Sequence, residues 1–277
     1  MILYKYMSFD DAILTLQDKT LVFSHLEDFN DPFECTTLGL YEHPISINNS
    51  NFVIQQKFSR NFLISCLTKQ PLNSLMWAHY ADSHNGVVIG INVKKAGLND
   101  AEKFIIPANE GEISYLKEQP KNLNKCTIEL LENIENLTWD EDGIILKQAL
   151  LNKMHFWSYE EEVRVVKKIT PHITTYCIPN KRVYEFDDQV WNKVNVRFKP
   201  IYTLKIPQEA FVDVTFGMGA YKKLRRLQIA KTGDYNLNSI DKLDRLFKLV
   251  GTMSIPLYRV EQDFENWKLV RSELNLD

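Results

Sequence analysis

The chain has 277 residues, of which 44% are hydrophobic and 25% charged, with a formal net charge of -3 and an isoelectric point near 6.1. This composition is that of an ordinary globular protein, and it excludes an overall electrostatic attraction to nucleic acid or to an anionic membrane. No stretch is long and apolar enough to span a bilayer, and residues 1–5 lack the layout of a signal peptide. We therefore expect a cytoplasmic protein without a membrane partner.

The cysteines predict neither a metal site nor a redox centre. Cys35, Cys66, Cys126 and Cys177 lie far apart in sequence, and no two of them have the spacing of zinc ligands or of a redox motif. Cys66 stands in an apolar run, which predicts that its side chain belongs to the core. Reduced cysteines agree with the expected cytoplasmic location.

In chain order, the first half of the sequence predicts short strands that alternate with short helices. Ser8, followed by Asp11 three residues later, predicts the cap of a helix. Runs rich in β-branched and aromatic residues predict strands, and Gly, Pro, Asn and Asp predict the turns between them. The expected elements are a strand at 3–6, the helix after Ser8, a strand at 21–24, a turn-rich loop at 29–34, a helix at 51–60, a strand at 61–67, a helix at 74–81 and strands at 87–91, 103–107 and 112–116.

The second half begins with a helical pattern and then returns to strands. Apolar residues at helical spacing predict helices over 124–156. A Glu-rich strand from 160 follows, then strands at 196–198, 202–206 and 212–217, helices near 219–230 and 237–249, and a tail that mixes strand with a short helix. Because strands and helices do not alternate regularly, we expect a single α+β domain. Its core would be a largely antiparallel, split sheet flanked by helices over residues 1–217, with a helical extension packed on it over 218–277.

The segment Trp157-Ser158-Tyr159-Glu160-Glu161-Glu162-Val163-Arg164 is the strongest candidate for a site. In a β-strand every second side chain points to the same face, so Glu160, Glu162 and Arg164 would line one surface. Like charges on one face are unfavourable unless other groups bond them, and the forked donors of Arg164 can do so in part. We take these three residues as catalytic candidates. The alternative interpretation is a solvated strand edge with an ion pair.

Further candidates come from polar and aromatic residues beside the predicted strands. Trp77 and Tyr80 offer flat faces on which a planar ring can stack, and His79 between them can donate or accept a proton. The alternative is that the two rings, at helical spacing, are core. Lys5 is either an anion contact or a lysine that protects a strand edge, and Asn30 is either a ligand contact or a turn former. The candidate binding residues are Lys5, Tyr6, Ser24, Asn30, Trp77, His79 and Tyr80.

The sequence resembles a bacterial family, the domain of unknown function 2971. The resemblance is carried by ordered motifs at 3–6, 29–34, 75–81, 86–91, 157–164 and 214–217, and so covers roughly residues 3–217. Members of this family are small cytoplasmic bacterial proteins, some encoded near mobile elements and defence genes. The resemblance therefore implies a fold family and does not imply a reaction.

The order of these parts also resembles that of ADP-ribosyltransferases, which carry a polar anchor on an early strand, a middle aromatic residue and a late Glu-x-Glu strand. This resemblance implies that Glu162 bonds the nicotinamide ribose of NAD, Glu160 positions an acceptor and Tyr80 stacks on the nicotinamide. The chain departs from the pattern at Lys5, where the transferases usually have His or Arg, and it lacks a Ser-Thr-Ser run.

The resemblance thus implies an enzyme that consumes NAD as its substrate, either a glycohydrolase or a transferase with a protein or nucleic-acid acceptor, acting as a toxin or phage-defence effector. A carboxylate that stabilises an oxocarbenium-like state would supply the chemistry. No metal is expected.

Two other functions remain open. One is a non-catalytic module that senses a nucleotide or binds a protein through His79, Tyr80, Glu160 and Arg164. The other is a metal-dependent nuclease, although its acidic residues follow no metal-site template; these are Asp31, Glu34, Glu160 and Glu162. The deciding observation is whether Tyr80 and the acidic row of 160–164 face one common cleft.

Overall fold

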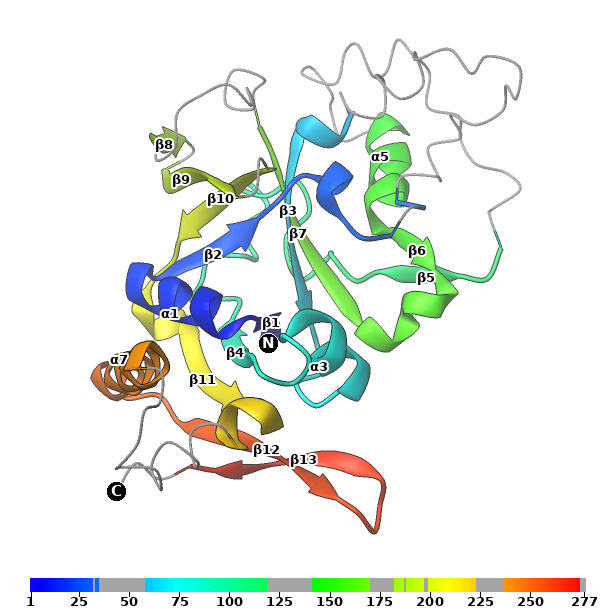
Figure 1. Cartoon of the computed structure of the whole chain (residues 1–277). Helices are drawn as coiled ribbons and strands as arrows, with labels where there is room; N and C mark the ends of the chain where they lie inside the picture. Colours follow the sequence, from blue (N-terminus) through cyan, green and yellow to red (C-terminus); the bar gives the residue numbers. More distant parts are fainter. Residues whose placement is uncertain are drawn as a thin grey trace.

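The computed structural model describes residues 1–31, 33–34, 58–118, 141–169, 182–186, 188–196, 199–222 and 237–274. Its architecture is α+β with a mostly antiparallel sheet, which confirms the predicted class (Figure 1). The larger sheet has the strand order β13 (Lys268–Glu273), β12 (Leu257–Asp263), β11 (Phe211–Phe216), β4 (Val87–Asn92), β1 (Ile2–Met7), β3 (Phe62–Thr68) and β7 (Glu162–Lys168).

A second sheet and a short strand pair complete the β structure. The second sheet has the order β2 (Thr20–Phe23), β10 (Lys199–Lys205), β9 (Gln189–Val196) and β8 (Arg182–Phe186), and all its neighbours are antiparallel. The pair consists of β5 (Ser114–Leu116) and β6 (Asn152–Met154), which run parallel.

The strands separate where the two sheets meet. β1 pairs with β3 at the single position Tyr4 opposite Thr68, whereas β3 pairs with β7 along its whole length. The end of β2 is joined to β3 by two backbone hydrogen bonds between Ser24 and Ile64, of 3.0 and 2.9 Å. β1 and β3 therefore diverge, and side chains from several elements project into the space between them.

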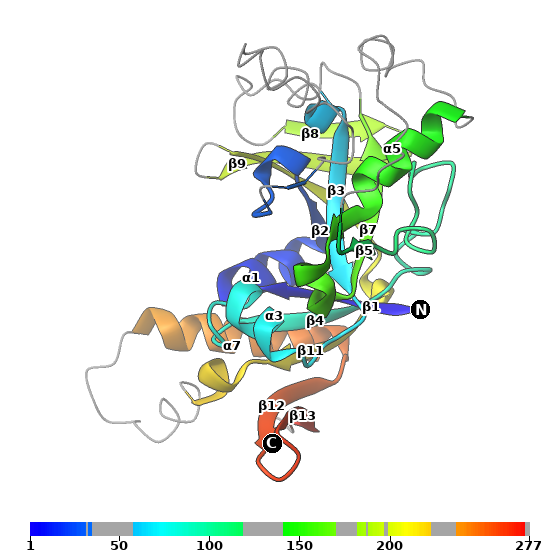
Figure 2. The ribbon, with the colours of Figure 1, turned by 90° about the vertical axis from the view of Figure 1, so that its right-hand side faces the viewer.

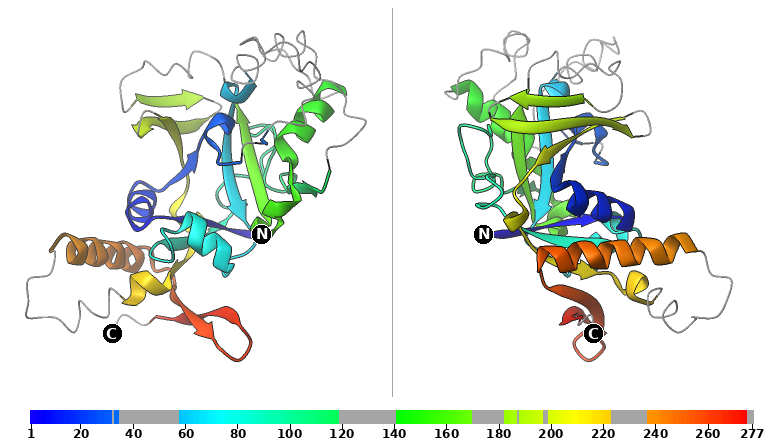
Figure 3. Two further views of the ribbon diagram at one scale, coloured as in Figure 1. Left: turned by 45° about the vertical axis from the view of Figure 1, so that its right-hand side comes forward. Right: turned by 90° about the vertical axis from the view of Figure 1, so that its left-hand side faces the viewer.

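Helices cover both faces of the larger sheet (Figures 2 and 3). α1 (Phe9–Asp18) begins at Ser8, whose Oγ accepts the N–H of Asp11 at 3.2 Å, as the sequence predicted. α1 and α7 (Leu237–Met253) lie side by side on one face, where Leu16 and Leu246 enter the same core cluster. On the other face α3 (Ser74–Tyr80) places Trp77 in a second cluster with Val88. α5 (Glu141–Leu151) packs Leu150 against Val166 of β7.

The C-terminal segment departs from its predicted helical character. α7 confirms the helix expected at 237–249, but β12 and β13 follow it, and β12 pairs in parallel with β11, so both strands extend the main sheet. Residues 254–274 contain no helix. These strands are only partly buried and carry many charged residues, so their periodicity is weak. The domain boundary at residue 217 stays a prediction.

Other differences are local. β6, β8 and β9 were not predicted, and the strand expected at 103–107 is reduced to one bridge between Ile106 and Val166. The predicted helix at 51–60 and the first part of that at 124–156 fall largely outside the described residues, as do most of 219–230 and the end of the strand at 196–198.

A left-handed turn fixes the end of α3. Asp82, Ser83 and His84 have positive φ angles of 47°, 51° and 67°. The carbonyl oxygen of His84 accepts the N–H of Gly219 at 2.9 Å, and a Cβ on Gly217 would lie 2.2 Å from that same oxygen. A side chain at residue 217 would therefore push the turn away from β11.

We expect Gly217→Ala to lower the free energy of unfolding by about 1–3 kcal/mol, because the backbone oxygen that it meets cannot rotate away. The matched control is Gly251→Ala in α7, where a Cβ meets nothing within 4 Å. That change should raise stability by about 0.5–1 kcal/mol, because alanine is the better helix former. Urea unfolding measures both, and equal effects of the two variants would contradict this packing.

Candidate functional site

One cavity of about 450 Å³ lies between β1 and β3. Its wall is formed by residues from β1, β2, β3, α3, β6 and β7, and by the 3-10 helices η1 (Leu26–Asp28) and η4 (His155–Glu160). Tyr80, Glu160 and Glu162 all line it. The structure thus brings the predicted aromatic residue and the two predicted carboxylates to one cleft, although their chemical roles remain predictions.

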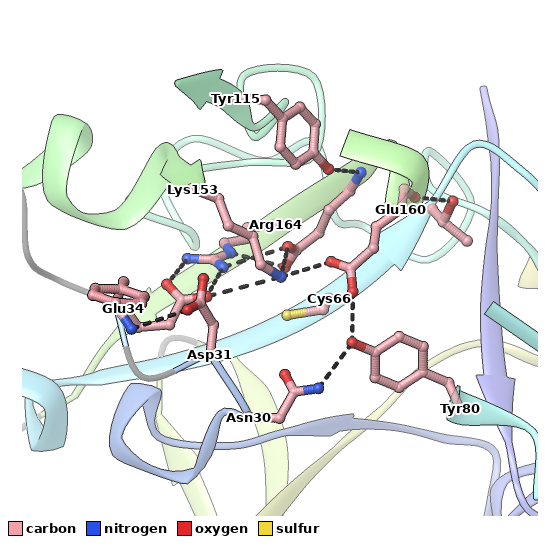
Figure 4. A network of polar contacts seen from close by, with 12 residues as sticks. Asn30, Asp31, Glu34, Cys66, Tyr80, Tyr115, Lys153, Glu160 and Arg164 are labelled. Atoms are coloured by element: carbon pink, nitrogen blue, oxygen red, sulfur yellow. Dashed lines mark hydrogen bonds and ion pairs between the residues drawn. The ribbon is translucent and has the colours of Figure 1, made fainter. Parts of the chain in front are cut away.

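Lys153 of β6 holds the two carboxylates together (Figure 4). Its ammonium lies 2.6 Å from an oxygen of Glu160 and 3.0 Å from one of Glu162, and it is itself buried. Its charge also faces the Trp157 ring, 5.0 Å from the centroid. Lys153 was not among the site residues predicted from the sequence. The one available signal was a lysine at the end of an apolar helical run.

Arg164 holds Glu162 in position through a hydrogen-bonded ion pair. The guanidinium is fully buried and binds Glu34 through two bonds of 2.6 and 3.0 Å, Glu162 at 2.8 Å and the carbonyl oxygen of Leu150 at 2.8 Å. Arg164 does not line the cavity, so we assign it a positioning role in place of the catalytic role taken from the sequence. The loop segment containing Glu34 is thereby fixed to β7.

The strand predicted from residue 160 is wrong at its start. Glu160 ends η4, Glu161 is left-handed with a φ of 40°, and β7 begins only at Glu162. Strand alternation therefore does not explain why Glu160 and Glu162 share a face. They do so because the backbone turns at Glu161, which sends its own side chain to the surface. A positive φ at a non-glycine residue carries no clear sequence signal.

Burial and the two cations give the carboxyl groups different acidities. Burial opposes the ionisation of Glu162, but Arg164 and then Lys153 outweigh it, so the pKa of Glu162 lies below its ordinary value. Burial raises the pKa of Glu160, and the attraction of Lys153 does not cancel this effect. Burial also disfavours the charged form of Lys153, but Glu162 and Glu160 outweigh it and raise the pKa of Lys153. Glu162 therefore stays ionised, whereas the pKa of Glu160 is raised toward neutral pH.

Hydrogen bonds hold Glu160 and its surroundings in place. The hydroxyl of Tyr80 donates to Glu160 at 2.5 Å, and the side-chain amide of Asn30 donates to the Tyr80 oxygen at 3.1 Å. The Thr68 hydroxyl donates to the backbone carbonyl of Glu160 at 2.5 Å. The hydroxyl of Tyr115 accepts the backbone N–H of Glu162 at 2.8 Å. These bonds join α3, β3, β5, η4 and β7 and fix the geometry of the cavity.

Of the six other predicted binding residues, five line the cavity: Lys5, Tyr6, Ser24, Asn30 and His79. Lys5 donates to the carbonyl oxygen of Cys66 at 2.8 Å, and among the described residues no carboxylate forms an ion pair with it. Cys66 itself is partly buried: it lines the cavity wall and packs against the edge of the core cluster that contains Ile64, which agrees in part with its predicted place in the core.

Trp77 does not reach the cavity. Its side chain is fully buried, its indole N–H donates to the Pro71 carbonyl oxygen at 3.1 Å, and its ring packs against Tyr6. The structure thus places Trp77 in the core, as the alternative interpretation of the sequence had it.

The acidic set of the nuclease hypothesis is bonded to cationic side chains. Glu34, Glu160 and Glu162 each contact Lys153 or Arg164. Asp31 is buried and accepts the backbone N–H of Phe33 at 2.9 Å. Within the described ranges, no three His, Cys, Asp or Glu side chains are grouped so that they could hold a metal ion. The nuclease hypothesis stays untested.

Comparison with known proteins gives one match. Residues 76–165 match the family described as protein of unknown function DUF2971, which confirms the family expected from the sequence. The matched segment runs from α3 to β7 and so includes Tyr80, Lys153, Glu160 and Arg164. No curated protein and no solved structure matched the chain. In the part of the chain that the structure describes, no helix combines the length and apolar character needed to cross a membrane.

Removing one charge from the buried network should be costly. We expect Glu162→Gln to lower the free energy of unfolding by about 3–5 kcal/mol, because Arg164 and Lys153 would be left as under-compensated buried cations. The control is Glu161→Gln, the same change at an exposed neighbour, with an expected effect of about 0.5 kcal/mol or less. Guanidinium unfolding measures both. Similar small losses in the two variants would show that the network does not hold this site together.

Proposed function

We propose that this chain, which its central segment places in the DUF2971 family, cleaves the bond between nicotinamide and ribose in NAD. The observation that carries the proposal is Glu160. Of the two glutamates in the cavity wall it is the one that is not bonded to Arg164, and both Tyr80 and Lys153 orient it. Such a carboxylate is the group needed beside a sugar carbon on which positive charge develops.

The cavity wall suits a flat, positively charged ring. Tyr4, Tyr6, Phe29 and Tyr80 contribute aromatic side chains to it. Its lysines and carboxylates together carry a formal charge of one negative unit when all are ionised; they are Lys5, Lys153, Asp28, Glu160 and Glu162. A pyridinium ring is attracted both by aromatic faces and by this negative charge. Lys5, which also lines the cavity, is available to a phosphate of the same ligand.

The reaction follows from these placements. The C1′–N bond breaks, its electron pair leaves with nicotinamide, and nicotinamide departs as a neutral molecule. The resulting positive charge on C1′ and the ring oxygen is stabilised by the Glu160 carboxylate. Water then attacks C1′ and releases its proton to the solvent, which gives ADP-ribose; alternatively, the nucleophile of an acceptor attacks C1′ and releases its proton in the same way. This mechanism exchanges the roles first taken from the sequence: Glu160 faces the sugar, and Glu162 anchors Lys153.

Transfer to a macromolecule is a narrower form of the same proposal. An enzyme that uses water releases free ADP-ribose, whereas a transferase leaves ADP-ribose on a protein or nucleic acid. A role as a toxin or phage-defence effector would follow from NAD depletion or from such modification.

The direct test measures nicotinamide release from NAD by the wild-type protein, Glu160→Gln and Glu161→Gln. We expect Glu160→Gln to reduce kcat by about 100-fold or more, because the neutral amide does not stabilise the developing charge. Glu161→Gln, which alters an exposed neighbour, should retain wild-type activity. Wild-type protein without nicotinamide release would refute the proposal, and thermal stabilisation by NAD under those conditions would point to a nucleotide-binding module.

The pH dependence of the rate supplies a second test. The reaction needs ionised Glu160, whose pKa is raised by burial, so activity should fall on acidification at a pH above the value of about 4.3 for a free glutamate. The Tyr80 hydroxyl donates to the ionised form and so lowers that pKa. Tyr80→Phe should therefore move the acid limb of kcat to higher pH. An unchanged limb, or a shift to lower pH, would count against Glu160 as the group that titrates.

A further inference from the structure

We propose that aromatic side chains at the mouth of the cavity form a subsite for the adenine base, so that the ligand is a dinucleotide and not a single nucleotide. The inference rests on the proposed function. We call these side chains the aromatic strip; they are His79, Tyr159 and Trp157, whose rings are neighbours, and the exposed Phe156, which precedes Trp157 in η4.

The strip is continuous with the cavity. His79 lines the cavity and is exposed, and its ring lies 6.3 Å from that of Tyr159. The Tyr159 ring lies 6.1 Å from the ring of Trp157. A ligand that leaves the cavity past His79 therefore meets a row of rings, and the other end of the row touches the catalytic network, because Trp157 covers the ammonium of Lys153.

The backbone of η4 explains why these rings gather on a surface. In a 3-10 helix, residues three apart lie above one another, which places Phe156 and Tyr159 on the same side and Trp157 with Glu160 on another. Trp157 and Glu160 both lie against Lys153. Phe156 is 80% exposed, whereas Tyr159 is partly buried and packs against the core cluster that contains Trp77. Packing of the core does not require a phenylalanine in that position.

The size of the cavity indicates what the strip binds. A cavity of about 450 Å³ lies in the lower half of the range of about 300–1,000 Å³ for small-molecule sites. In the proposed function it holds the nicotinamide and its ribose, and the adenosine half extends past His79. Adenine is flat and uncharged, and bases stack well on exposed aromatic side chains. A peptide or lipid chain would not need a row of flat faces beside a carboxylate site.

The experiment compares NAD with nicotinamide mononucleotide, which lacks the adenosine half, in the wild-type protein and two variants. Tyr159→Leu keeps apolar volume and removes the flat face, and Phe156→Ala removes the most exposed ring of the strip. The control is Phe264→Ala, which removes an equally exposed ring, 78% accessible, from the β12–β13 hairpin. We expect KM for NAD to rise by about tenfold in Tyr159→Leu, less in Phe156→Ala and not at all in Phe264→Ala. KM for the mononucleotide should stay unchanged throughout.

Equal changes for the two nucleotides, or no change for NAD in Tyr159→Leu, would overturn the inference. A third arm separates its failure from that of the proposed function, because AMP carries the adenine without the reacting bond. If the protein does not turn over NAD or nicotinamide mononucleotide, the subsite is tested by calorimetric titration with AMP. A roughly tenfold weaker affinity of Tyr159→Leu than of the wild-type protein supports the subsite, and equal affinity or no AMP binding refutes it.

Discussion

The site depends on a single ammonium group placed between two carboxylates. Three buried glutamates, Glu34, Glu160 and Glu162, would repel one another, and each loses water of hydration on burial. Lys153 and Arg164 offset both effects because their bonds reach all three, and those bonds join the loop at 33–34, β6, η4 and β7. The formal charge of the five groups is one negative unit when all are ionised. Glu160 and Glu162 both line the cavity.

The charged network faces a cavity because the strands β1 and β3 diverge at the same place. β1 and β3 share one residue pair, so the region between them is filled by side chains and a cavity, and not by ladder hydrogen bonds. Aromatic residues from β1 and α3 line this cavity together with the bonded carboxylates, and the Tyr80 hydroxyl donates to Glu160. Rigid elements thus carry both the ring-binding and the charge-stabilising groups, and such preorganisation is what electrostatic catalysis requires.

Local sequence patterns predicted much of the fold, and long-range pairings did not follow from them. The β-branched run of β4 and the Ser8 cap of α1 were recognised because their signals lie within a few residues. β9 was missed because Asn192, Lys193 and Asn195 interrupt its apolar pattern. In the site, the acidic residues at 160–162 could be predicted because they lie next to one another in the sequence. The bond from Arg164 to Glu34 spans 130 residues, and the position of Lys153 depends on β6 running beside η4. Only the folded chain shows these contacts.

The central claim is that one buried carboxyl group is a fixed anion while its neighbour two residues away exchanges its proton. The most direct measurement is a pH titration of the glutamate side-chain carboxyl carbons by ¹³C NMR, with Glu160→Gln and Glu162→Gln used to assign the two signals. The account requires the Glu160 signal to titrate above the ordinary glutamate range and the Glu162 signal to remain that of an ionised group down to the acid limit of the folded state. Titration of both at ordinary values, or in the reverse order, would contradict it.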